Sequence, residues 1–106
     1  MTFIRIIKYT DAYTALPQAK QVEIRNAALA FHDKYFKEGK LKEAYTFGDG
    51  SGRIMMVWDV ASLEEFYTIH TGSPQSSPYV TTEVIPVLDR QTTRNVIAAA
   101  TKAAKK

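Results

Sequence analysis

Cysteine is absent from this chain of 106 residues, and histidine occurs only twice. Without cysteine there can be no disulfide, no thiolate nucleophile and no Cys-ligated zinc site. Long apolar runs are also missing near the N-terminus, because Arg5 and Lys8 interrupt the first apolar segment. This excludes a signal peptide or a membrane span there, so we expect a cytoplasmic protein without a membrane partner.

An excess of charge is missing from most of the chain. The formal charge of +3 comes from 14 basic and 11 acidic side chains, and Lys102, Lys105 and Lys106 account for all of it. A solvated basic tail explains this pattern better than a site for nucleic acid or anionic lipid. The other basic residues are dispersed and are not interleaved with aromatic ones, so we expect no nucleic-acid partner.

Hydrophobic residues make up 45% of the chain, which suffices for one core in one domain. Periodicity and turn residues predict four strands and three helices. The strands are expected at 2–9, 40–47, 53–60 and 79–88, and the helices at 17–38, between Ser62 and Gly72, and at 91–106. The order βαββαβ is typical of an α+β ferredoxin-like fold, with two helices on one face of a four-stranded antiparallel sheet. This domain should span residues 1–90, with a short C-terminal helix and the basic tail in 91–106.

Several local signals define the ends of these elements. Gly39 follows "KYFKE" as the expected left-handed residue after the long helix, and Ser62 and Glu65 have the spacing of a capping box. The stretch 10–16 is polar and predicts a loop. Pro86 has no amide hydrogen, so the last strand should lie at an edge of the sheet or carry a bulge near its end.

Both faces of the strand at 53–60 carry apolar residues. Met56 and Trp58 point to one side, and Met55 and Val57 to the other. Two helices cover only one face, and a monomer rarely exposes a large apolar patch. We therefore expect a homodimer in which two sheets pack face to face.

Three stretches resemble one protein family. "EGKL", "WDVASLEEFYTIHTG" and "PYVTTEVIPVL" are similar to the muconolactone isomerase family over residues 36–88. The resemblance implies a ferredoxin-like fold that dimerises into an α/β barrel, and isomerisation of a small lactone without metal or organic cofactor. The acidic proton carrier of that family falls near Ala27 and Ala28 here, and neither alanine can move a proton.

A fainter resemblance points to another activity. "VWDVASLEEFYTIH" is similar to a segment of the cofactor-poor and heme-degrading monooxygenases of the same superfamily. Those heme-degrading enzymes have an asparagine on the first strand, and "TFIRIIKY" has none.

Two polar residues of the helix at 17–38 are candidates for catalysis. At 100° per residue, Arg25 and His32 fall within a broad apolar arc that includes Val22, Leu29 and Phe36. A histidine there either carries protons or is a hydrogen-bonded core residue. The arginine either binds a substrate carboxylate or is ion-paired and solvated.

The remaining candidates would shape a binding site. His70 shares a helix face with Phe66, but two histidines on different helices with no third ligand do not predict a metal site. The aromatic residues are core or interface residues, or walls of an apolar pocket with phenols available for an oxygen atom. The candidate substrate-binding residues are Tyr9, Tyr35, Trp58, His70 and Tyr79.

Three hypotheses for function follow from these observations. In the first, a small cofactor-independent, isomerase-like enzyme binds an apolar oxygenated molecule between helices and sheet, with His32 moving a proton and Arg25 holding an anion. The second is a cofactor-poor or heme-handling monooxygenase that uses Trp58 and His70. The third is a non-catalytic ligand-binding module.

Overall fold

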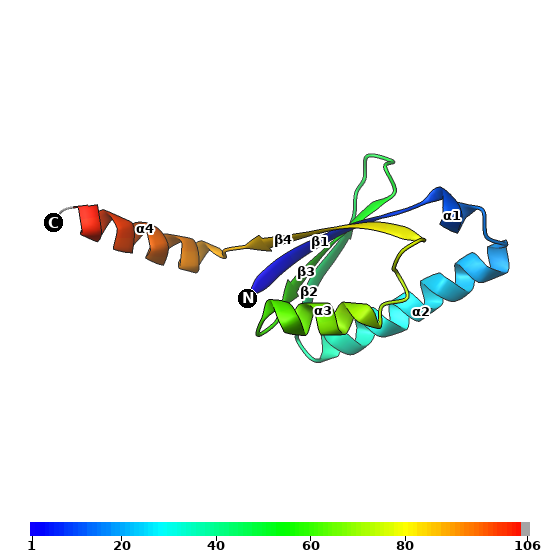
Figure 1. The fold of residues 1–106 in the computed structure, drawn as a ribbon, viewed down its shortest axis with the longest axis horizontal. Coiled ribbons are helices and arrows are strands. Elements are labelled where there is room, and N and C mark those ends of the chain that lie inside the picture. Colours follow the sequence, from blue (N-terminus) through cyan, green and yellow to red (C-terminus); the bar gives the residue numbers. More distant parts are fainter. Residues whose placement is uncertain (105–106) are drawn as a thin grey trace.

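The computed structural model describes residues 1–104, and its elements follow the expected order with one addition (Figure 1). The strands are β1 (Thr2–Tyr9), β2 (Leu41–Thr46), β3 (Arg53–Asp59) and β4 (Val80–Val87). The helices are α1 (Asp11–Thr14), α2 (Gln18–Lys37), α3 (Leu63–Thr71) and α4 (Arg90–Ala104). The predicted loop at 10–16 is wrong in part, because the amides of Tyr13 and Thr14 bond to the carbonyl oxygen of Thr10 and close the short helix α1.

The sheet has the strand order β2-β3-β1-β4, and every neighbouring pair is antiparallel. Helices α2 and α3 lie on the same face of it (Figure 1). Strand β4 is at an edge, as Pro86 predicted, and Pro86 lies opposite Phe3 of β1. The α+β ferredoxin-like architecture expected from the sequence is thus confirmed.

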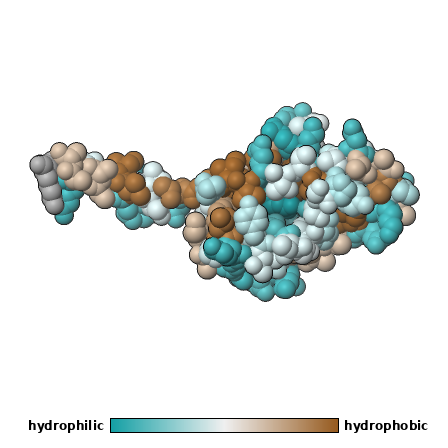
Figure 2. Space-filling view, viewed as in Figure 1, coloured by the Kyte–Doolittle hydropathy of each residue, from teal (hydrophilic) through white to brown (hydrophobic). Residues whose placement is uncertain are grey.

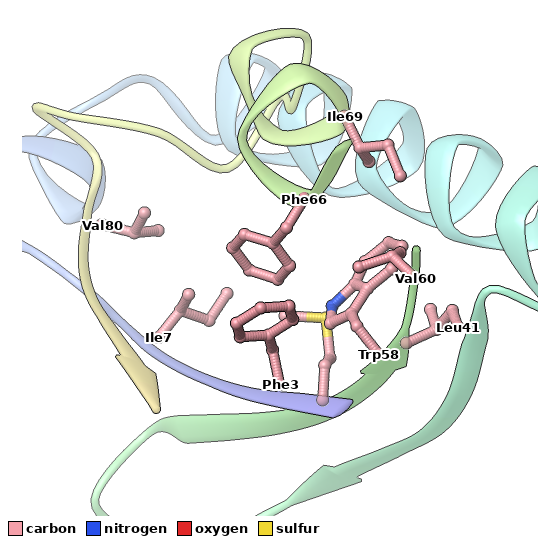
Figure 3. Packing of buried hydrophobic residues seen from close by; sticks show 9 residues of the cluster. Phe3, Ile7, Leu41, Trp58, Val60, Phe66, Ile69 and Val80 are labelled. Atoms are coloured by element: carbon pink, nitrogen blue, oxygen red, sulfur yellow. The ribbon is translucent and has the colours of Figure 1, made fainter. Parts of the chain in front are cut away.

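The core lies between the sheet and α3 (Figure 3). Alternation along β1 points Phe3 and Ile7 toward the helices, and the adjacent strand β3 adds Met56 and Trp58. Phe66 of α3 descends onto them, with its ring 5.1 Å from that of Phe3 and 6.3 Å from that of Trp58. Burial of these large side chains is the main favourable term holding α3 on the sheet.

The signals at the helix ends are largely confirmed. Gly39 has φ +74°, the left-handed conformation expected after α2. Ser62 Oγ accepts a hydrogen bond from the amide of Glu65 at 3.1 Å. The Glu65 carboxylate accepts from the amide of Ala61, one residue before the position that a capping box requires, and pairs with Lys40 at 2.8 Å.

The apolar arc expected along α2 is wrong in part. Ala28 is the buried residue of this helix, while Val22, Leu29 and Phe36 are exposed. Arg25 is exposed and His32 is half-buried. The helix does not press these side chains into the sheet, because a cleft separates part of α2 from β2 and β3.

The C-terminal helix α4 projects from the end of β4 and lies apart from the sheet and the other helices (Figure 1). None of its described residues is buried. Figure 2 shows hydrophobic surface along this helix and at its base, where Leu88, Val96 and Ile97 are exposed. Lys105 and Lys106 of the expected basic tail lie outside the described residues.

The sheet face opposite α2 and α3 is apolar at its centre. Ile4, Ile6, Met55 and Val57 lie there half-buried, and no helix within residues 1–104 covers them (Figure 1). Of the described helices, none has the length and hydropathy needed to cross a bilayer.

Candidate functional site

A cleft of about 300 Å³ lies between α2, the sheet and the loop at 73–78. We call it the α2-side cleft. Its walls are mostly apolar, and the small side chains of Ala28 on α2 and Ala44 on β2 leave room between helix and sheet. An apolar cleft of this size that includes a few polar groups is typical of a small-molecule site.

His32 supplies one of these polar groups. Its Nε2 atom is buried and has no hydrogen-bond partner within residues 1–104. Burial, helped by the positive charge of Arg5 and opposed by Asp33, lowers the pKa of His32 to about 4. The imidazole is therefore neutral at pH 7.

Gln75 and Tyr9 form a hydrogen-bonded pair in the same cleft. Gln75 Nε2 donates to Tyr9 Oη at 2.8 Å, and the Gln75 backbone is held by Ser73 Oγ, which accepts from the Gln75 amide at 3.1 Å. The side-chain oxygen of Gln75 is buried without a partner in the described part of the chain. A buried polar atom without a partner costs free energy, and a bound molecule that donates to this oxygen would recover it.

Arg25 lines the cleft from α2, seven residues and two helical turns before His32. Its side chain is exposed, so its charge stays hydrated when the cleft is empty. A guanidinium at this position can pair with an anionic group of a bound molecule.

The other candidate residues lie elsewhere. Trp58 is fully buried in the core, and Tyr35 packs edge-on against it with ring centroids 5.6 Å apart. Tyr79 is half-buried outside the cleft. The structure thus brings Tyr9, Arg25 and His32 together and places Tyr35, Trp58 and Tyr79 apart from them.

His70 lies on the α3 side of the core. Its ring stacks on Phe66 at 4.0 Å, and its Nδ1 bonds the carbonyl oxygen of Phe66 at 2.8 Å. Burial lowers the pKa of His70 to about 4. Because Nδ1 must donate to the carbonyl, Nε2 is an acceptor, and it has no partner among residues 1–104.

Sequence reasoning missed two residues near the site, Arg5 and Gln75. Arg5 is 3% exposed and Gln75 4% exposed. The alternation of β1 could have revealed Arg5, since it shares a face with Phe3 and Ile7. Gln75 lies in a loop, where no periodicity indicates which side chains turn inward. In residues 1–104, no cluster of three or more His, Asp or Glu side chains could hold a metal ion.

No protein-family model and no curated protein sequence matches the chain. Among solved structures, the chain is similar to the crystal structure of muconolactone isomerase at 3.3 Å resolution, with a TM-score of 0.69. The superposition covers 85% of this chain and 91% of the isomerase chain, and the sequence identity is 20%. The chain has the muconolactone isomerase fold. At this identity the likeness concerns the fold alone, and it agrees with the resemblance seen in the sequence at 36–88.

Proposed function

We propose that the protein is a small, cofactor-independent, isomerase-like enzyme whose α2-side cleft binds a small apolar molecule with oxygen substituents. The observation that carries this proposal is the pair of buried, unpartnered atoms in a mostly apolar cleft, Nε2 of His32 and Oε1 of Gln75. Buried polar groups in folded proteins are normally paired. Here a ligand is the simplest partner for both.

The proposed chemistry is a proton shift. Neutral His32 would remove a proton from a carbon next to a carbonyl group, and the electron pair would move into an enolate. Arg25 would stabilise that negative charge or hold a carboxylate of the substrate. In a substrate whose enolate is conjugated with a carbon–carbon double bond, the imidazolium would return the proton to the far end of the conjugated system, which moves the double bond and completes an isomerisation with no change in oxidation state.

His32 occupies a suitable place for this role. It lies one helical turn after Ala28, on the same face of α2. Ala27 and Ala28 stand where the isomerase family resemblance puts an acidic proton carrier. A base displaced by one turn along the same helix would still reach a molecule in the cleft.

The test is proton exchange with muconolactone in D₂O, followed by ¹H NMR. His32→Ala should slow the exchange by about a hundredfold or more, as expected for loss of a general base. Asn26→Ala, an exposed change on the same helix, is the matched control and should leave the rate unchanged. An unimpaired His32→Ala protein would refute the mechanism. Binding without exchange in the wild type would favour the non-catalytic ligand-binding module.

The monooxygenase hypothesis depends on His70, whose Nε2 is unpartnered on the α3 side. A heme titration followed by absorbance tests it directly. A spectral change that is present in the wild type and absent in His70→Gln would favour this activity over isomerisation.

We further propose that a second copy of the chain covers the open face of the sheet, as in the α/β barrel implied by the family resemblance. The half-buried row of Ile4, Ile6, Met55 and Val57 supports this, because a monomer rarely leaves such a patch in water. In light scattering after gel filtration, Val57→Glu should shift the mass toward that of one chain, whereas the exposed control Thr68→Glu should not. A monomeric wild type would refute the dimer.

A further inference from the structure

Another cavity lies between α3, β4 and the loop at 73–78. Its volume is about 230 Å³, and we call it the α3-side cavity. Its lining combines the hydroxyl side chains of Thr71, Ser76, Ser77 and Thr82 with His70 and with the largely apolar side chains of Phe66, Tyr67 and Val84. The proposed isomerase chemistry makes no use of this cavity.

Arg5 lines the α3-side cavity from the centre of the sheet. Arg5 is only 3% exposed. The residues opposite it on the neighbouring strands are apolar, Met56 on β3 and Val84 on β4. One guanidinium nitrogen, Nη2, donates to the backbone oxygen of Gln75 at 2.7 Å and lies 3.4 Å from Thr82 Oγ1. The other, Nη1, is buried and unpartnered within residues 1–104.

No acidic side chain in the described part of the chain forms an ion pair with Arg5. Glu83 of the adjacent strand lies opposite Ile6 and therefore on the other face of the sheet. Burial lowers the pKa of Arg5 to about 10, so the side chain still carries its charge at pH 7. A buried charge without a counter-ion is costly, and proteins rarely keep one that is not paired.

We propose that the α3-side cavity binds a small organic carboxylate, with Arg5 as its buried counter-ion. The planar, forked guanidinium matches the two oxygens of a carboxylate, and the free Nη1 provides a donor that the protein itself does not use. The hydroxyl side chains of Ser76, Ser77 and Thr82 can donate further hydrogen bonds. Phe66 and Tyr67 provide an apolar surface for the rest of the molecule, so an aromatic acid fits this wall better than a bare inorganic ion.

This site is separate from the α2-side cleft and goes beyond the proposed function. Gln75 lies between the two, because its backbone oxygen binds Arg5 while its side chain binds Tyr9. An anion in the α2-side cleft would instead pair with Arg25. Substitution of the two arginines, one at a time, therefore distinguishes the two sites.

The experiment is a calorimetric titration of the full chain with sodium benzoate, and with neutral benzamide as the matched ligand. Benzoate should bind and benzamide should not. Arg5→Met keeps an unbranched apolar stem without the charged guanidinium and should weaken benzoate binding by about tenfold to a hundredfold, as expected for loss of charge-assisted hydrogen bonds. In Arg25→Met, the benzoate binding that depends on Arg5 should remain.

Three results would overturn the proposal: no binding of benzoate to the wild type, equal binding of benzamide, or loss of binding in Arg25→Met but not in Arg5→Met. Inorganic phosphate that binds as tightly as benzoate would overturn the assignment to an organic carboxylate. Amide chemical shifts of the wild type give a second test that needs no variant. Benzoate should perturb the amides of Thr71, Ser76 and Ser77, and perturbation confined to Ala44 and Thr46 of the α2-side cleft would place the anion at the wrong site.

Discussion

The two histidines should make the protein less stable in mild acid. In the folded chain the pKa of both His32 and His70 lies near 4, against an ordinary value of 6.5, chiefly because burial disfavours the charged imidazolium. The positive charge of Arg5 contributes to the lowering of both pKa values. The unfolded chain therefore takes up protons at a higher pH than the folded chain does.

The sign and size of the effect follow from linkage. The contribution of the two neutral histidines to stability is fully present above pH 6.5, falls as the pH drops, and is lost by about pH 4. At roughly 1.4 kcal/mol for each pKa unit, the full difference is worth about 3 kcal/mol per histidine, and about 2 kcal/mol of it is lost between pH 7 and pH 5. Because both rings are half-buried and His32 contributes to the shift of His70, solvent screening and coupling reduce the sum, and the two histidines together remove at most about 4 kcal/mol over this range.

Urea unfolding at pH 7, 6 and 5 measures the free energy directly. His32→Gln and His70→Gln should each remove about half of the decrease, because glutamine does not titrate. Since the chain has two histidines, their two Hε1 signals in an NMR titration report the pKa values separately. If both signals titrate near 6.5, the reasoning about burial is refuted.

Three further substitutions test other features. Gly39→Ala should lower the free energy of unfolding by about 1 kcal/mol, because φ is +74° at this position and alanine disfavours this conformation. Gly48→Ala is the control, since Gly48 has open space around it and no positive φ. A similar loss of stability in Gly48→Ala would contradict the argument. Ser62→Ala should lower the free energy of unfolding by about 1 kcal/mol through loss of the cap on α3, and an unchanged urea midpoint would show that the cap contributes nothing. Arg5→Met should raise the pKa of both histidines in the NMR titration, since Arg5 lowers both; unchanged values would show that its charge is screened from them.

Much of the fold could be predicted from local signals that act over a few residues. Gly39 ended α2 and Ser62 began α3 as expected, and Pro86 lies on an edge strand. These predictions hold because backbone geometry and the lack of an amide hydrogen act whatever the tertiary context. The short helix α1 was missed, since a single turn closed by backbone hydrogen bonds leaves no periodic pattern.

The site could be predicted only in part. The helical period placed His32 and Arg25 on one face of α2, but it could not show that a cleft, and not a packed interface, separates that face from β2. Arg5 was read as an interruption of an apolar strand, although its alternation put it in the core. Gln75 depends on the path of a loop between Gly72 and Val80, which only tertiary contacts determine.

Both edges of the sheet carry features that hinder growth by strand addition. On β4, Pro86 offers no amide hydrogen to an added strand, and on β2 the register shifts between Leu41 and Glu43, with charged Lys42 and Glu43 along the edge. Such features are the usual protection of edge strands against open-ended β-aggregation. The proposed association through the apolar face of the sheet would then be a closed event between two surfaces, and the same sheet is a poor template for a fibril.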